Sequence, residues 1–280
     1  MASNPVISVE YRGRVAVVTI DNEKKLGALS QDNYFDLATR MNEIARHDEV
    51  VTTVITGRGR YFSAAHIMLS GADVSVGRDI PSSTTPADAY RMWLQTFVAF
   101  NLNITHAFAH HAKIIVAALN GPVVGLSAAI IGWADFVYCT PHAFLLTPFS
   151  SLGLVAEGGA SRALASRLGP AKANEALLMS KRIPAGELKA CGFVNEIFDF
   201  AEDQDGLFRE RVLREVEDRL GEHLNAESIL GIKKLLRRPD VDVHNAQSVH
   251  EVFAGLDRFV RGIPQDEFRK IASGEKRHKL

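Results

Sequence analysis

One acidic residue stands in an apolar, glycine-rich stretch of the sequence. Residues 152–159 read LGLVAEGG, and Glu157 is the one charged member. Charged side chains are rarely buried unless they are paired or functional, and a carboxylate in an apolar pocket has a raised pKa. A raised pKa suits a general base near neutral pH. The stretch therefore predicts a proton-transferring base, with an exposed loop carboxylate before the next helix as the alternative.

A second stretch offers main-chain donors rather than a reactive side chain. In residues 120–129 (NGPVVGLSAA) a turn follows an apolar run, and a helix is predicted to begin around Gly125 and Leu126. The first turn of a helix has unpaired N–H groups at the positive end of its dipole. Such groups can hold an anion or a developing oxyanion. The alternative is a tightly packed helix start that binds nothing.

A third stretch, residues 70–73 (SGAD), follows the letters YFS at residues 61–63. It is typical of a turn after a strand. Aspartates in turns usually bond to nearby backbone, so this stretch gains functional weight only in combination with the other two.

The composition limits the classes of protein. Among 280 residues, 46% are hydrophobic and the net charge is −1, which argues against a general nucleic-acid binder. A chain of this length can bury a core without disulfides or metals. The two cysteines, Cys139 and Cys191, form no CxxC pair and favour a reducing compartment. The first residues hold no apolar segment typical of a secretory signal.

One uncharged run raises the question of a membrane span. Residues 114–134 are long enough to cross a bilayer, but Asn-Gly-Pro at residues 120–122 interrupts them. We therefore predict a buried strand, a turn and a buried helix, with no membrane span.

Strands and helices alternate up to about residue 200. Predicted strands cover residues 15–20, 51–56, 114–119, 136–139, 144–146 and 193–198. Predicted helices follow Ser30 as N-cap and cover residues 89–112, 126–134, 160–168 and 171–179. Beyond residue 200 only helices are predicted, over residues 205–220, 226–236, 244–260 and 265–271. The pattern predicts an α/β core, residues 1–200, and a helical region, residues 201–280.

Together the three stretches resemble the crotonase (enoyl-CoA hydratase/isomerase) superfamily, which carries F-S-x-G-A-D, N-G-P-x-x-G and L-G-L motifs in this order. The resemblance extends to residues 15–30 (VAVVTIDNEKKLGALS) and 183–195 (IPAGELKACGFVN), so it covers nearly the whole chain. It implies a spiral of stacked ββα units followed by a C-terminal helical trimerisation region, and hence a homotrimer or hexamer.

The positions of the carboxylates separate activities within the superfamily. Similar hydratases use two glutamates, and the matching positions here hold Ala129 and Phe149, which cannot ionise. Two-glutamate hydration therefore lacks its acid and base. The single Glu157 resembles instead the Δ3,Δ2-enoyl-CoA isomerases of the fungal peroxisomal type.

That resemblance implies an isomerase that shifts the double bond of 3-enoyl-CoA to 2-trans-enoyl-CoA in fatty-acid β-oxidation. Glu157 would carry the proton between two nearby carbons, and the backbone N–H groups of Ala72 and Leu126 would form the oxyanion hole. The implied substrate-binding residues are Ala28, Ser70, Gly71, Asp73, Gly125, Phe149, Lys24 and Lys233. CoA would be part of the substrate, and neither a separate cofactor nor a metal is expected.

Two other functions remain open at this stage. One is a different acyl-CoA enzyme on the same scaffold, a hydratase or a dienoyl-CoA isomerase. The other is a catalytically weak acyl-CoA-binding subunit, which the six extra residues 64–69 (AAHIML) favour because they split the first motif. We interpret the insertion as a tolerated loop extension. For the basic cluster around Lys233, the alternative is a solvated helix face.

The sequence ends in His278, Lys279 and Leu280, which resemble a variant of the S-K-L peroxisomal signal. We therefore expect a peroxisomal protein that is recognised by the import receptor.

Overall fold

In the computed structural model, which describes residues 5–64 and 85–276, the strands form two sheets. The larger sheet has the order β1-β2-β3-β4-β6-β9, with β1 antiparallel to β2 and the other pairs parallel. Its strands are β1 (Ile7–Arg12), β2 (Val15–Ile20), β3 (Thr52–Gly57), β4 (Ile114–Leu119), β6 (Phe136–Cys139) and β9 (Glu196–Ile197). The smaller sheet holds β5 (Val123–Val124), β7 (Phe144–Leu146) and β8 (Ile183–Pro184).

Seven helices of the described chain precede residue 200. They are α1 (Gln31–Ala45), α3 (Pro86–Trp93), α4 (Ala99–Ala109), α5 (Leu126–Ile131), α6 (Ala160–Leu168), α7 (Pro170–Leu177) and α8 (Ala185–Ala190). A π-helical segment, Leu94–Val98, joins α3 to α4, so the long helix predicted for residues 89–112 forms with one irregular turn. The helix predicted after Ser30 also forms, and Ser30 caps it in a capping box with Asn33.

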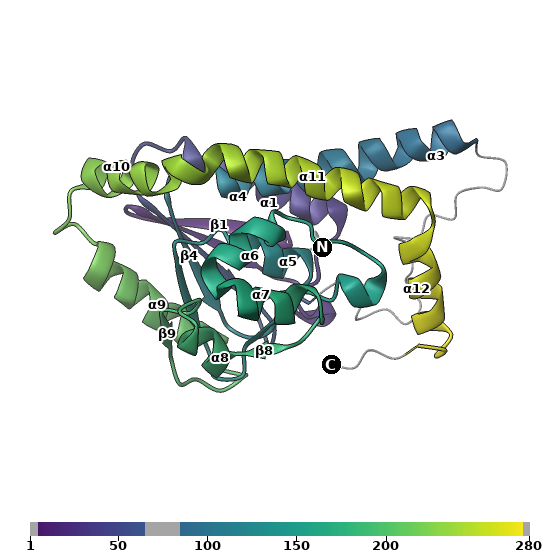
Figure 1. Cartoon of the computed structure of the whole chain (residues 1–280). Coiled ribbons are helices and arrows are strands. Elements are labelled where there is room, and N and C mark those ends of the chain that lie inside the picture. The colour runs from purple at the N-terminus through teal and green to yellow at the C-terminus, as the bar shows by residue number, and fades with distance from the viewer. Residues whose placement is uncertain (1–4, 65–84, 277–280) are drawn as a thin grey trace.

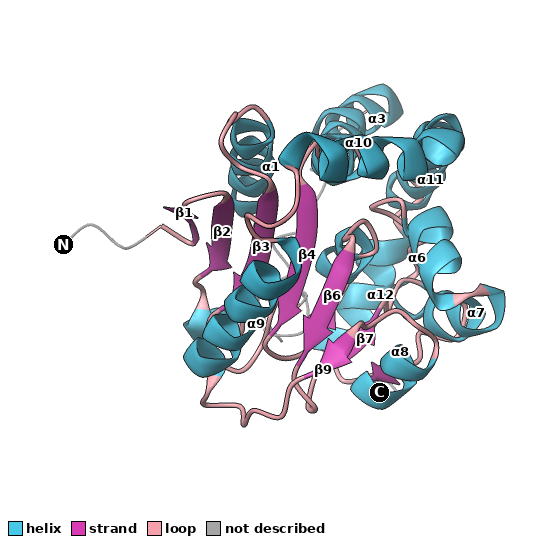
Figure 2. Cartoon of the chain, turned by 90° about the vertical axis from the view of Figure 1, so that its left-hand side faces the viewer, coloured by secondary structure: helices cyan, strands magenta, loops and turns pink. Residues whose placement is uncertain are grey.

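The predicted helical region beyond residue 200 consists of α9 (Asp205–Leu220), α10 (Ala226–Arg237), α11 (Val241–Val260) and α12 (Ile263–Ala272). α9 lies across one face of the larger sheet (Figure 2), where Phe208, Val212 and Val216 pack on the side chains of β2, β3 and β4. The helical region therefore completes the core of the residues before it. Within the described residues, no helix is both long and apolar enough to cross a membrane.

Three strands were not predicted from the sequence, and one is shorter than predicted. β5 and β8 have two residues each, too few to show an alternating pattern. The six residues of β1 do alternate between apolar and polar side chains, so the sequence held a strand signal that the prediction overlooked. The strand predicted over residues 193–198 is reduced to β9, because Phe193 and Val194 bond to the end of α8 instead.

The parallel register brings three loops to one edge of the sheet. Ile20 lies opposite Gly57, so the segments that follow β2 and β3 leave the sheet side by side. Asn120, just after β4, accepts a hydrogen bond from Gly57 N (3.0 Å) and donates one to Gly59 O (2.7 Å). The carboxyl ends of parallel strands are a usual place for ligand sites in α/β sheets.

The long helix α11 runs along α3 and α4 (Figure 1), and apolar side chains join the two layers. The rings of Trp93 and Phe259 stack with centroids 4.5 Å apart. Gly255 faces Phe97 so closely that a Cβ there would lie 2.7 Å from its ring atoms. This packing holds α11 over the region between α4 and α6.

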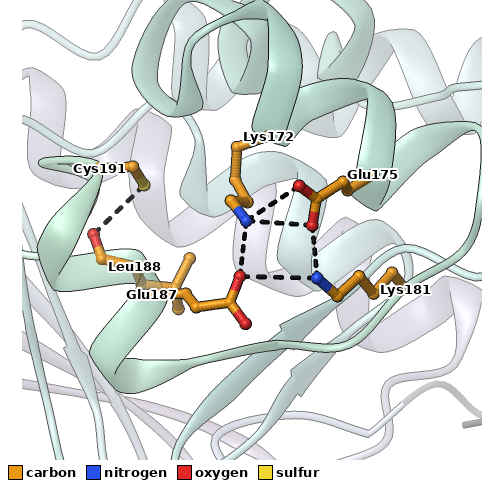
Figure 3. A network of polar contacts seen from close by, with 6 residues as sticks. All are labelled: Lys172, Glu175, Lys181, Glu187, Leu188 and Cys191. Carbon is orange, nitrogen blue, oxygen red and sulfur yellow. Dashed lines mark hydrogen bonds and ion pairs between the residues drawn. The ribbon is translucent and has the colours of Figure 1, made fainter.

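Charged side chains of α7 and α8 form an ion-pair network at the surface (Figure 3). Lys172 Nζ lies 3.0 Å from Glu175 and 2.6 Å from Glu187, and Lys181 contacts the same two carboxylates. Because these side chains are in contact with solvent, we expect the network to add little stability.

Candidate active site

Glu157 lies in the loop between the 3-10 turn Ser150–Leu152 and α6, and part of its surface stays open to solvent. The two glycines after it are buried and have left-handed backbone (φ +69° and +76°). A Cβ at Gly158 would lie 2.8 Å from side-chain atoms of Leu126 and Ala129, and one at Gly159 would lie 2.3 Å from the Trp133 ring. The glycines therefore let this loop pack directly on α5.

Asn101 of α4 orients the Glu157 carboxylate. Its Nδ2 donates to Glu157 Oε2 at 2.8 Å, and its Oδ1 accepts from Gly158 N at 3.1 Å. Asn101 is fully buried, and Thr105 Oγ1 donates to its main-chain oxygen. One amide thus binds both the base and the backbone next to it, which fixes the direction in which the carboxylate points.

The electrostatic surroundings of Glu157 differ from those of an ordinary surface glutamate. Burial, together with a smaller contribution from the negative charge of Glu251 on α11, raises its pKa to about 7, against a lowering by the Asn101 hydrogen bond. A carboxyl group with this pKa exchanges protons readily near neutral pH. The loop therefore presents a group able to serve first as base and then as acid.

The amide of Leu126 is the first N–H of α5, a position that has no acceptor within its own helix. Gly125 reaches this turn with φ +68°, and its own N–H bonds to Leu146 O. The next residue, Ser127, is held by Tyr34 Oη (2.7 Å) and by Ser63 Oγ (2.8 Å). These bonds fix the start of α5, which gives an N–H donor in the vicinity of Glu157.

The first loop, residues 21–30 between β2 and α1, meets the segment before residue 65 near the start of α5. Ser63 O accepts from Val124 N at 2.9 Å, and Gly27 approaches Phe62 so closely that a Cβ there would lie 2.7 Å from its main-chain oxygen. Ala28 is buried in this loop, and its carbonyl accepts from Asn22 Nδ2. The structure therefore brings Ala28, Gly125, Leu126 and the Glu157 loop into one region.

Four predicted site residues fall outside the described part of the chain, namely Ser70, Gly71, Ala72 and Asp73. The insertion at residues 64–69 is described only at Ala64, whose N–H bonds to Leu26 O. The structure also describes the two positions expected to hold glutamate in a hydratase. Ala129 faces Gly158, and Phe149 packs in the main core with 2% of its surface exposed. Neither position offers an ionisable group.

The two predicted lysines have different surroundings. Lys24 is exposed in the turn Glu23–Lys25 of the first loop. Lys233 instead lies inside the chain, where its Nζ is 2.7 Å from Asp135 Oδ2 and its side chain is 10% exposed. This ion pair gives Lys233 a partner within the chain, and its contact with CoA stays a prediction. The solvated helix face considered for this cluster does not describe Lys233.

Asn101 and Glu251 were not predicted from the sequence, although each position carries a signal. Asn101 and Thr105 are polar residues one turn apart at buried positions of α4. Glu251 interrupts an apolar stripe of α11. A polar side chain inside a buried stripe needs a partner, but the sequence does not say which. Among the described residues, no group of three or more His, Cys, Asp or Glu side chains is placed to hold a metal ion.

Comparison with known proteins points to one family. The enoyl-CoA hydratase/isomerase family matches residues 10–211. A Pyricularia oryzae protein named Delta(3,5)-Delta(2,4)-dienoyl-CoA isomerase is 60% identical, over 98% of this chain and 99% of its own. A Saccharomyces cerevisiae 3,2-trans-enoyl-CoA isomerase is 31% identical, over 99% of this chain and 98% of its own.

The fold has solved counterparts. The crystal structure of an enoyl-CoA hydratase/isomerase from Pseudoalteromonas atlantica superposes with a TM-score of 0.80 at 22% identity, and covers 98% of this chain and 100% of that one. The predicted spiral α/β fold of the crotonase type is therefore confirmed.

Proposed function

The chain belongs to the enoyl-CoA hydratase/isomerase family, and we propose that within it the protein is an enoyl-CoA isomerase that converts 3-enoyl-CoA to 2-trans-enoyl-CoA. The observation that carries the proposal is the Glu157 site. One carboxylate has a pKa raised to about 7, is oriented by Asn101, and lies in a loop that packs on Leu126 and Ala129 of α5. Both positions that would supply a second glutamate for hydration are apolar.

The proposed reaction needs one base and one anion site. Glu157 takes a proton from C2 of the thioester, and the electrons left behind form a dienolate with its negative charge on the thioester oxygen. The N–H of Leu126, together with that of Ala72, stabilises this oxyanion. The protonated Glu157 then returns the proton at C4, so the double bond moves to C2 and the carboxylate is regenerated. Removing one such donor typically slows a reaction by about 10²–10³.

The second buried carboxylate near the site is not free to share this chemistry. Both oxygens of Glu251 accept hydrogen bonds from the backbone at the start of α6. Glu157 is therefore the one carboxylate near this site, among the described residues, that we propose for proton transfer between C2 and C4, which lie two bonds apart.

A Δ3,5,Δ2,4-dienoyl-CoA isomerase is the second candidate, and the 60% identity to the Pyricularia protein of that name favours it. It would use the same proton removal at C2 and the same oxyanion hole. The proton would return at C6 instead of C4, so Glu157 would have to reach farther along the acyl chain or a second group would have to deliver it.

A two-substrate assay separates these activities. The purified full chain is given trans-3-hexenoyl-CoA or a 3,5-dienoyl-CoA, and the absorbance of the conjugated 2-enoyl or 2,4-dienoyl thioester is followed. We expect faster turnover of the first substrate, and a loss of at least about 10³-fold in Glu157→Gln with unchanged activity in the exposed control Glu227→Gln. Faster turnover of the dienoyl ester would establish the second candidate. Binding of both esters without turnover would indicate a binding subunit.

The substrate would enter along the carboxyl edge of the sheet, next to the first loop. We propose that exposed Lys24 contacts the adenosine end of CoA and that Ala28, Ser70, Gly71, Asp73, Gly125 and Phe149 line the rest of the site. CoA is then part of the substrate, and the proposed mechanism uses no separate cofactor.

We also propose a homotrimer or hexamer. The apolar side chains of Ile232, Leu235 and Leu236 on α10 are each more than half exposed, which is unfavourable on a monomer surface. Mass photometry of the purified chain checks this proposal, and a stable monomer at micromolar concentration would contradict it.

The expected peroxisomal signal, residues 278–280, lies outside the described residues. We propose that it directs the enzyme to the peroxisome through the import receptor. A fluorescent fusion that lacks the three residues should become cytosolic, whereas unchanged punctate fluorescence would refute the signal.

A further inference from the structure

The helix that follows the catalytic loop has no cap of its own. α6 begins at Ala160, and its N-cap residue is Gly159, which has no side chain to accept from the first N–H groups. The acceptor comes from far along the chain. Glu251 Oε2 accepts from Gly159 N at 2.7 Å, and Oε1 accepts from Ser161 N at 2.7 Å. A carboxylate at this end of a helix is also favoured by the helix dipole.

The carboxylate of Glu251 is fixed and buried. Only 5% of the residue surface is exposed, Ser161 Oγ donates to the same carboxylate, and Gln247 Nε2 in turn donates to Ser161 Oγ (2.9 Å). The helix that carries Glu251 is anchored by the apolar contact of α11 with α3 and the π-helical segment (Figure 1). The position of Glu251 is therefore set by α11, the helix that carries it, and not by the loop whose amides it binds.

We propose that Glu251 is a positioning residue for Glu157: from α11 its carboxylate caps α6, holds the Glu157–Gly159 loop on α5, and keeps a negative charge close to the base. The inference rests on the proposed function, because it concerns how the proton-transferring group of that site is held and tuned. Gly159, one of the two residues whose amides Glu251 binds, is only two positions after Glu157.

Among the titratable groups of the described residues, Glu251 is the one whose charge acts on Glu157. From α1, the Tyr34 hydroxyl is kept neutral by burial, and from α4 the partner of Glu157 is the uncharged Asn101. The hydrogen-bond donors to Glu251 itself are two amides and one hydroxyl, all uncharged. Among the described residues Glu251 has no ion pair. Burial raises its own pKa, and in its ionised form its negative charge disfavours the ionised form of Glu157.

The test combines a neutral and a charged replacement with a control on the same helix. Glu251→Gln keeps the shape but removes the charge, Glu251→Asp keeps the charge but shortens the reach, and Asp257→Asn removes an exposed charge of α11. For Glu251→Gln we expect the acid limb of kcat/KM to move down by about one pH unit, with a plateau about tenfold lower because the base is weaker. Glu251→Asp should keep the acid limb nearer its original pH, and Asp257→Asn should match the parent chain.

A purely structural role for Glu251 would lower the plateau of both variants equally and leave the acid limb in place, which would overturn the proposal. A second measurement does not depend on turnover. In protein labelled with ¹³C at glutamate side-chain carboxyls, the Glu157 signal is the one missing in Glu157→Gln. We expect it to titrate near pH 7 in the parent chain and at lower pH in Glu251→Gln. If the parent turns over no enoyl-CoA but this shift occurs, the proposed function fails and the positioning role stands. An unchanged titration refutes the positioning role.

Discussion

Two shielded carboxylates in this molecule have opposite properties. Asp135, at the start of β6, lies between Lys233 (2.7 Å) and Arg237 (2.8 Å) and also accepts from Ile115 N. Burial alone would raise its pKa, but the two cations and these hydrogen bonds outweigh burial and hold the pKa below its usual range. Glu157 has one amide donor and a second carboxylate nearby, and its pKa is raised to about 7.

The comparison shows that partners, more than burial, decide what a buried carboxylate does. The lowered pKa favours the ionised form of Asp135, which joins α10 to the sheet through its ion pairs with Lys233 and Arg237. Among the described residues no cation pairs with Glu157, and its two protonation states are close in free energy near neutral pH. That property costs stability when the group ionises, and it is the property that proton transfer needs.

The largest effect on stability is expected at the ion pair. Asp135→Ala leaves Lys233 buried without its counterion, and we expect the free energy of unfolding to fall by about 3–5 kcal/mol. Urea unfolding at pH 7 measures this change. The exposed pair of Asp257 with Arg261 provides the control, where Asp257→Ala should cost less than about 1 kcal/mol. If Asp135→Ala and Asp257→Ala lowered the free energy of unfolding equally, Asp135 would behave as an ordinary surface carboxylate and the prediction would be wrong.

Glu157→Gln should act in the opposite direction. The pKa of Glu157 is higher in the folded state than its usual value of 4.5, so folding favours the protonated form. The contribution of this protonated form to stability is full below about pH 4.5 and is lost as the pH rises through about 7. The substitution should therefore raise the free energy of unfolding by about 1–3 kcal/mol at pH 8 and by much less at pH 4.5. Thermal unfolding at both pH values measures this difference, and a destabilised variant at pH 8 would mean that the carboxylate is compensated after all.

A smaller change is expected when the single donor to the base is removed. Without the Asn101 amide the pKa of Glu157 should rise further, because that hydrogen bond favours the ionised form. In Asn101→Ala we expect the acid limb of kcat/KM to move to higher pH and the rate at pH 7 to fall about tenfold. Asn103→Ala, at an exposed position of the same helix, is the matched control. An acid limb that stays in place would show that Asn101 only fills space.

The predictable part of the site lies within single segments. Glu157 was predicted from its charge in an apolar stretch, and Leu126 from a turn followed by a helix start, because both signals depend on neighbours in sequence. Asn101 and Glu251 were missed because their partners lie 56 and 92 residues away. The ion pair of Lys233 could not be predicted for the same reason, since its partner Asp135 is 98 residues away.

By itself, the sequence determined the family, the long helices and strands, and the residue type at each position of the site. The absence of ionisable groups at positions 129 and 149 is likewise a fact of the sequence. Only the tertiary structure decided which carboxylate is neutralised and which stays a base. Charge and burial act through distance in space, and that distance is set when α10 folds onto the sheet and α11 onto the start of α6.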